Sequence, residues 1–311
     1  MFKQKNKCKC KYLYKNYKMT SSNHPEYAYL NLMDRILEKG TYHPDRTGTG
    51  VYSYFGEQIR FPIKDSFPLL TTKKMFSKGI IEELLWFLKG QTDNKVLQEK
   101  GVKIWDGNST RDFLDKRGLT NYEEGDCGPI YSFQWKHFGA EYKDCHTDYK
   151  GQGVDQVNYI LEELRKDPNS RRIFMSAWNP SDLPKMCLPP CHVSAQFYVR
   201  ENKFLSCHMY MRSCDVFLGL PFNIASYALL TYMLAAQTGL TPDELIISFG
   251  NIHIYSNHVE QVKEQLTREP MEWCTLELDD PSTWTMDTIT KEQIKINNYT
   301  SNGTIKATMA V

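Results

Sequence analysis

The stretches VSAQFYVR (193–200) and FLSCHMYMR (204–212) decide the fold class. Both alternate apolar with polar residues, which is typical of strands that bury one face. The polar pair Glu201 and Asn202 joins them, so we predict an antiparallel hairpin. Arg212 closes the second strand and faces away from its apolar row. That apolar row is Leu205, Cys207, Met209 and Met211.

Helical segments flank this hairpin. The apolar run 222–238 follows Pro221 and stops before Gly239, which predicts a core helix with a Pro start and a Gly stop. Apolar spacing predicts further helices at 27–39, 79–90 and 154–164, and further strands at 51–61, 172–178, 245–255 and 273–278. Because strands and helices do not alternate strictly, we predict an α+β (mixed α/β) fold.

Composition narrows the class of protein. Of the 311 residues, 41% are hydrophobic and 24% are charged, and the net charge is +1. These values are typical of a soluble globular chain and give no strong case for nucleic acid as a partner. The longest apolar stretch, 225–236, is too short to span a membrane. Nine cysteines without a signal segment favour reduced thiols and a cytoplasmic location.

The N-terminal 24 residues differ from the rest of the chain. They are rich in lysine and lack periodicity, so we predict a disordered tail (1–24) followed by one catalytic domain (25–311). The lysines could serve nuclear import as an alternative to a simple solvated extension. Cys8 and Cys10 resemble half of a metal site, but no second pair with suitable spacing follows.

Cys191 is the candidate nucleophile. It lies in PPCH (189–192), where two prolines restrict the backbone that leads into a strand. A reactive thiol needs a nearby positive charge, which Arg212 or the Arg171-Arg172 pair could provide. The alternatives are a buried inert cysteine and a metal cluster with Cys187, although a fourth ligand is missing.

Arginines recur where loops meet strands. Arg46, Arg171, Arg172 and Arg212 could bind phosphate oxygens through their guanidinium groups, or form surface ion pairs. Asn223 lies near the start of the core helix. Its amide could cap the helix, or it could donate to and accept from the edge of a planar ring.

Five motifs resemble the thymidylate synthase family, and the resemblance spans about residues 25–311. They are DRTGTG (45–50), ELLWF (83–87), LPPCH (188–192), RSCD (212–215) and GLPFNIASY (219–227). The resemblance implies a bent mixed β-sheet packed with helices, with one sheet face forming a homodimer interface. It also implies that Arg171 and Arg172 complete the active site of the partner chain, and that dUMP and folate are the small-molecule partners.

The resemblance assigns roles to single residues. Arg46, Arg212 and Ser213 match the ligands of the dUMP phosphate, and Cys191 matches the nucleophile that attacks C6 of uracil, with Arg212 favouring its thiolate. Glu83 and Tyr131 match the residues that handle protons through ordered water. The base and the sugar are matched by Asn223, His253 and Tyr255.

The cosubstrate implied is 5,10-methylenetetrahydrofolate, which donates the one-carbon unit and the hydride and leaves as dihydrofolate. Asp215, Asn108, Trp105 and the C-terminal Val311 match its contacts. No metal ligands are expected, and the reaction implied requires none.

Three departures from the family pattern stand out: Met211 replaces a glutamine, Asn251 an aspartate, and SNG (301–303) a Pro-His-Pro segment. They leave two alternatives open, a dUMP hydroxymethylase and a weakly active paralogue with a binding or regulatory role.

Overall fold

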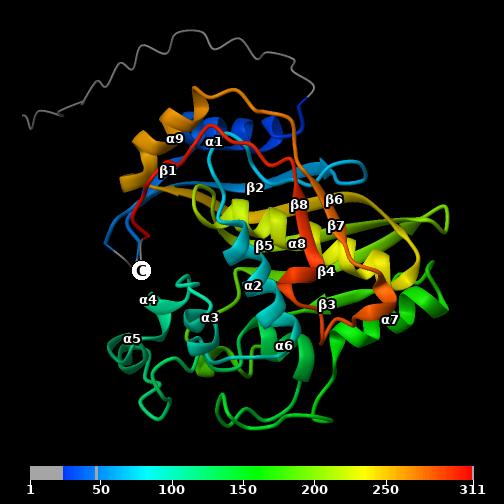
Figure 1. The fold of residues 1–311 in the computed structure, drawn as a ribbon. Helices are drawn as coiled ribbons and strands as arrows, with labels where there is room; N and C mark the ends of the chain where they lie inside the picture. Colours follow the sequence, from blue (N-terminus) through cyan, green and yellow to red (C-terminus); the bar gives the residue numbers. More distant parts are fainter. Residues whose placement is uncertain (1–23, 46–47, 310–311) are drawn as a thin grey trace, which may run out of the picture.

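The computed structural model describes residues 24–45 and 48–309 (Figure 1). The predictions made for the lysine-rich tail, for Arg46 and for Val311 therefore lie outside the described residues. Over the described part, helices pack around a central sheet, and the α+β prediction is confirmed.

The main sheet has six strands in the order β1-β2-β6-β5-β4-β3. β5 and β6 are parallel, and the other neighbouring pairs are antiparallel. A second sheet pairs two short strands near the C-terminus. The strands are β1 (Thr41–His43), β2 (Val51–Pro62), β3 (Phe174–Ser176), β4 (His192–Arg200), β5 (Phe204–Asp215), β6 (Thr241–Tyr255), β7 (Thr275–Leu278) and β8 (Ile294–Asn297).

The predicted hairpin is confirmed as β4 and β5. Glu201 and Asn202 make the tight turn, with φ angles of 56° and 51°, a backbone shape typical of two-residue hairpin loops. The four residues of the predicted apolar row are each at most 2% exposed. β5 extends beyond Arg212 to Asp215, which brings polar side chains to the end of a buried strand.

The core helix α8 (Gly219–Thr238) packs on β5 and β6. It begins before Pro221, so the predicted start is wrong, because proline is tolerated in a first helical turn, where its missing N–H has no helical acceptor. Gly239 ends the helix with φ of 70°. α8 is the one described helix long and apolar enough to cross a membrane, but 72% of its apolar window is buried inside the protein, as in a core helix.

The remaining helices surround the sheet, and Figure 1 shows α1 and α9 side by side near one end of it. Helices α1 and α2 agree with the predicted segments to within about two residues. The helices besides α8 are α1 (Tyr27–Lys39), α2 (Ser77–Leu88), α3 (Lys95–Glu99), α4 (Asp106–Ser109), α5 (Arg111–Lys116), α6 (Tyr131–His137), α7 (Gln156–Lys166) and α9 (Val259–Leu266).

Two predicted boundaries are wrong for local reasons. The strand expected at 172–178 is only three residues long, because Arg171 and Arg172 lie in a turn before it. The helix expected from Val154 starts at Gln156, because Asp155 caps it by accepting from the Asn158 N–H at 2.9 Å.

Buried Glu26 ties together segments that are distant in the sequence. Its carboxylate accepts hydrogen bonds from the N–H and hydroxyl groups of Thr71 and Thr72, and from the Trp273 indole. Thr71 in turn accepts a hydrogen bond from Asn302 N–H at 2.8 Å. The start of α1 is thereby connected to the C-terminal segment.

Replacing Gly239 by alanine should lower the free energy of unfolding by about 1 kcal/mol, since a Cβ at positive φ is strained even though no atom lies near the site. Urea denaturation at fixed protein concentration measures this. Gly239→Asn is the control and should lose less, because asparagine tolerates this conformation. Equal stability of the alanine variant and the parent chain would contradict the argument.

Candidate active site

Cys191 lies in a turn that Arg212 holds in place. The guanidinium donates from Nε to the Pro190 carbonyl at 2.7 Å and from Nη2 to the Pro189 carbonyl at 2.9 Å. The Arg212 main-chain N–H also donates to the Cys191 carbonyl at 2.9 Å. Because proline also fixes φ on this segment, the thiol has a defined position at the start of β4.

Tyr131 contacts Cys191 from the first residue of α6. The Cys191 N–H donates to the phenol oxygen at 2.6 Å. The ring stacks on His192 with 4.0 Å between centroids, and His192 Nδ1 lies 2.9 Å from the Tyr227 hydroxyl. Burial lowers the pKa of His192 to about 3. His192 is therefore neutral, and it is held by stacking on Tyr131 and by its contact with the Tyr227 hydroxyl.

The two adjacent glutamates of α2 have different partners. Glu82 is paired with Lys100 at 2.6 Å. Glu83 accepts a hydrogen bond from the Trp105 indole at 2.8 Å. Burial raises the pKa of Glu83 to about 7, although the Trp105 hydrogen bond opposes the shift. Burial therefore disfavours the charged form of Glu83, which can gain or lose a proton near neutral pH.

Aromatic contacts connect these groups. The Trp105 and Tyr131 rings meet edge to face, 6.1 Å between centroids, and the Arg212 guanidinium lies 5.2 Å from the Trp178 ring centroid. Burial, with the Cys191 charge as the next cause, holds the pKa of Tyr131 well above its usual value, and Arg212 opposes this. Tyr131 is therefore a neutral phenol beside the thiol.

The end of β5 supplies the next polar residues. Ser213 is half-buried, and Asp215 Oδ1 accepts from the N–H groups of Phe217 and Leu218 at 3.1 and 3.2 Å. Within the described chain, Asp215 Oδ2 makes no hydrogen bond. Asn223 lies inside α8 rather than at its cap, and its side chain makes no hydrogen bond to any described residue. The capping interpretation of Asn223 is therefore wrong.

His253 and Tyr255 follow on β6, beside the end of β5. Parallel pairing places His253 next to Asp215, and the rings of His253 and Tyr255 meet edge to face at 5.3 Å. The departure at Asn251 is part of this group, because its Oδ1 lies 2.9 Å from His253 Nδ1. The departure at Met211 is buried, 2% exposed, on the opposite face of β5.

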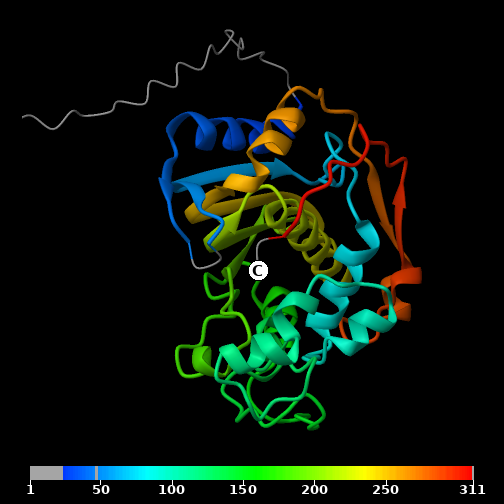
Figure 2. The same cartoon turned by 90° about the vertical axis from the view of Figure 1, so that its left-hand side faces the viewer.

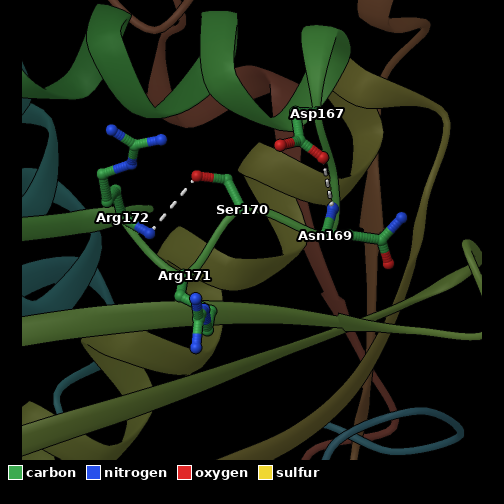
Figure 3. A pocket seen from close by; sticks show the side chains of 5 residues that line it. All are labelled: Asp167, Asn169, Ser170, Arg171 and Arg172. Atoms are coloured by element: carbon green, nitrogen blue, oxygen red, sulfur yellow. Dashed lines mark hydrogen bonds between the residues drawn. The ribbon is translucent and has the colours of Figure 1, made fainter.

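Arg171 and Arg172 lie apart from this group, at an open surface pocket with Asp167, Asn169 and Ser170 (Figure 3). Their guanidinium groups point in different directions, and the Arg172 N–H donates to Ser170 Oγ at 3.3 Å. No hydrogen bond or ion pair joins either arginine to Cys191 or Tyr131 within the residues that the structure covers.

The sequence did not indicate Lys73, which is 6% exposed. Its ammonium donates to the Phe217 carbonyl and lies 3.9 Å from the centroid of the Phe217 ring. Burial lowers its pKa to about 7, and Asp215 opposes the shift. The sequence pattern around Lys73 did not mark it as a site residue, because Lys73 lies in a loop and only the fold brings it near Asp215.

The C-terminal segment is pinned despite its departure from the family. Asn302 Nδ2 donates to the Glu269 carbonyl at 2.8 Å, and the Gly303 carbonyl accepts from Lys74 N at 2.9 Å and Arg268 Nη1 at 3.0 Å. Gly303 has φ of 91°, which proline cannot adopt. Figure 2 shows this red segment running from the β8 side toward the centre of the molecule.

Asn108, a predicted folate contact, lies in α4 and is 8% exposed.

Together, the fold and the site define a mixed α/β protein with a cysteine held between an arginine and a neutral tyrosine, beside a carboxyl group that titrates near neutrality. The thymidylate synthase family model matches residues 27–311. The chain is 54% identical to thymidylate synthase of Homo sapiens over 93% of its own length and 91% of that protein. It belongs to the thymidylate synthase family.

Bifunctional relatives are longer. The chain is 52% identical to the bifunctional dihydrofolate reductase-thymidylate synthase of Zea mays over 94% of this chain and 56% of that protein. The identity to the bifunctional protein of Paramecium tetraurelia is also 52%, over 93% of this chain and 62% of that protein. The chain therefore spans less than two thirds of the length of these two relatives.

Glu83 should make stability depend on pH. Its pKa is about 7 in the folded chain against an ordinary value of 4.5, so between these values the folded state holds a proton that the unfolded state has lost. Stability should therefore fall as pH rises through this window and stay level above it. Between about pH 5 and about pH 8, the parent chain should lose about 2–3 kcal/mol more than Glu83→Gln.

Urea denaturation at both pH values, at one protein concentration, measures the difference. Glu82→Gln is the matched control. It removes the neighbouring carboxylate, which is paired with Lys100, and leaves Glu83 in place. An identical pH dependence in the parent chain and in Glu83→Gln would show that Glu83 ionises normally.

Proposed function

We propose that this chain is a thymidylate synthase that methylates dUMP reductively to dTMP. The observation that carries the proposal is the arrangement of Cys191 between Arg212 and Tyr131 in a chain of this family. Arg212 supplies the positive charge that a reactive thiol requires.

The substrate contacts follow from the groups left available. Arg212 uses Nε and Nη2 on carbonyls, so its remaining N–H groups can donate to phosphate, together with Ser213 and Arg46. The unbonded amide of Asn223 can donate to O4 and accept from N3–H of uracil. His253 and Tyr255 are placed to bind the deoxyribose hydroxyl. The Cys191 sulfur then adds to C6 of the ring.

The described residues also fit the folate. Asp215 keeps Oδ2 available to an N–H of the pterin, and Trp105 and Asn108 offer an indole and an amide from the region of α4. When bound, 5,10-methylenetetrahydrofolate supplies the one-carbon unit and the hydride. Trp105 and the C-terminal segment ending in Val311 would exclude water from the reaction.

Proton transfer falls to Glu83 and Tyr131. With a pKa of about 7, Glu83 can both hold and release a proton at neutral pH. Tyr131 accepts from Cys191 N–H, so its own proton remains available to a water molecule near C5.

We further propose a cytoplasmic homodimer formed through the open sheet face, with residues 25–311 as one catalytic domain. Phe174, Tyr198 and Tyr210 project from neighbouring strands and are 45%, 64% and 41% exposed. Exposed aromatic side chains of this size on one face favour a protein interface. Arg171 and Arg172 lie away from Cys191 in their own chain, which is consistent with donation to the partner site.

Cys191→Ser should abolish turnover and leave dUMP binding within about threefold, because a hydroxyl is a poor nucleophile at neutral pH while the phosphate contacts remain. Calorimetry measures the binding. Chromatography of the nucleotides from the parent chain identifies the product. Mainly 5-hydroxymethyl-dUMP would support the hydroxymethylase alternative, and very slow turnover would support the weakly active paralogue.

Asn223→Asp should erode the preference for dUMP over dCMP by at least tenfold, because a protonated carboxyl can pair with the cytosine edge that the amide opposes. The measurement is kcat/KM for both nucleotides. Asn251→Asp is the control: it restores the family residue beside His253 and should leave the preference unchanged. An unaltered ratio in Asn223→Asp would remove this residue from base recognition.

A further inference from the structure

A second group of reactive side chains lies outside the active site. The ligand atoms of Asp93, Cys145 and His146 lie within 4.8 Å of one another. The carboxylate of Glu123 lies 3.3 Å from His146 Nε2. One thiol, one imidazole and two carboxylates therefore meet at a partly exposed position, and none of them contacts Cys191 in the part of the chain that the structure describes.

The loop that carries Cys145 and His146 is tightly built. The Asp144 carboxylate accepts from the N–H groups of His146 and Thr147 at 2.9 and 2.8 Å. The Tyr149 hydroxyl accepts from Lys143 N–H and donates to the Asp144 carbonyl, both at 2.8 Å. These bonds fix the positions of Cys145 and His146 without using the thiol or the imidazole.

Asp93 is also held in place. Its carbonyl accepts from the Trp86 indole at 3.1 Å, and its Oδ1 accepts from Lys95 N–H at 2.9 Å. Gly125, with φ of 100°, lies so close that a Cβ there would be 3.0 Å from Asp93 Oδ1. The other carboxylate oxygen remains available to a ligand.

The surroundings favour a cation. The carboxylates of Asp126, Asp93 and Glu123 all lie near the Cys145 thiol. Asp126 behind the group is 1% exposed. The cation at this group is Lys95, which lies 3.4 Å from Glu123 and is half-exposed, and an exposed ion pair of this kind contributes little to stability. A divalent ion would displace it at little cost.

We propose that Asp93, Cys145, His146 and Glu123 bind one divalent transition-metal ion of the zinc class. A thiolate, an imidazole and carboxylates are zinc ligands, and four of them satisfy its tetrahedral preference. Tetrahedral zinc places its donors about 3.5 Å apart, so the ligand atoms of Asp93, Cys145 and His146, which lie within 4.8 Å of one another, need to close by about 1 Å. Glu123, which contacts His146, would turn from the imidazole to the metal as the fourth ligand. On binding, the Cys145 thiol releases its proton to solvent, and His146 donates a neutral nitrogen.

The site would fasten three segments that are far apart in the sequence: the turn before α3, the loop at Glu123 and the Cys145 loop. Residues 126–130 connect this region to Tyr131. The metal would therefore have a structural role and would take no part in the reaction. The proposal departs from the sequence prediction of no metal ligands, and spacing did not indicate this group because Asp93 and Glu123 are distant from Cys145 along the chain.

The test uses the full chain with Cys8 and Cys10 replaced by alanine, treated with a chelator and then dialysed. Zinc is titrated in competition with a chromogenic zinc indicator, and cobalt is titrated separately. We expect one equivalent of zinc to be withheld from the indicator, a thiolate-to-cobalt charge-transfer band, and a higher melting temperature with zinc. Cys145→Ala and His146→Ala should each weaken zinc binding at least tenfold and should remove or diminish the band.

His43→Ala is the matched control, because His43 is an exposed histidine outside the group, and it should bind zinc as the parent does. Asp93→Asn keeps an acceptor for the Lys95 N–H, so it tests the carboxylate without losing that bond. The inference is overturned if the parent withholds no zinc, if cobalt gives no charge-transfer band, or if zinc uptake survives in both Cys145→Ala and His146→Ala.

Discussion

The burial of α8 is the constraint on which the rest of the structure depends. Thirteen of its side chains are buried, and each large apolar one contributes about 1.5–3 kcal/mol relative to exposure. The helix is apolar on every side, so it requires neighbours on every side. β5 and β6 cover one side, and α2 and α7 cover others. The parallel pairing of β5 and β6 follows, because α8 itself is the crossover that connects these strands.

This packing determines where the chemistry lies. The face of β5 that α8 covers must be apolar, so polar residues can lie on it only beyond the helix. The end of β5 is such a place, and Arg212, Ser213 and Asp215 lie there. Arg212 then binds the carbonyls of Pro189 and Pro190 and restricts the main chain that leads into Cys191. The position of Cys191 thus depends on Arg212, and the position of Arg212 depends on the packing of β5 under α8.

Low polarity around the site gives two groups a pKa near neutrality. Burial raises the pKa of Glu83 and lowers that of Lys73, in each case to about 7. The same cause acts in opposite directions because burial disfavours whichever form is charged. The chain thereby keeps a carboxyl and an amine that can exchange protons near physiological pH.

The sequence alone determined the fold class, the β4–β5 hairpin and the core helix, because alternation and apolar runs are local signals. The sequence identified Cys191 as the nucleophile only through the resemblance of its motifs to a family, because a cysteine that follows two prolines can also be inert. Tertiary structure decided the Arg212 clamp and the burial of Lys73 beside Asp215. It also decided the meeting of Asp93 with Cys145. These contacts join residues that are distant along the chain. Their separation in the sequence does not predict their separation in space, because the packing of the fold brings them together.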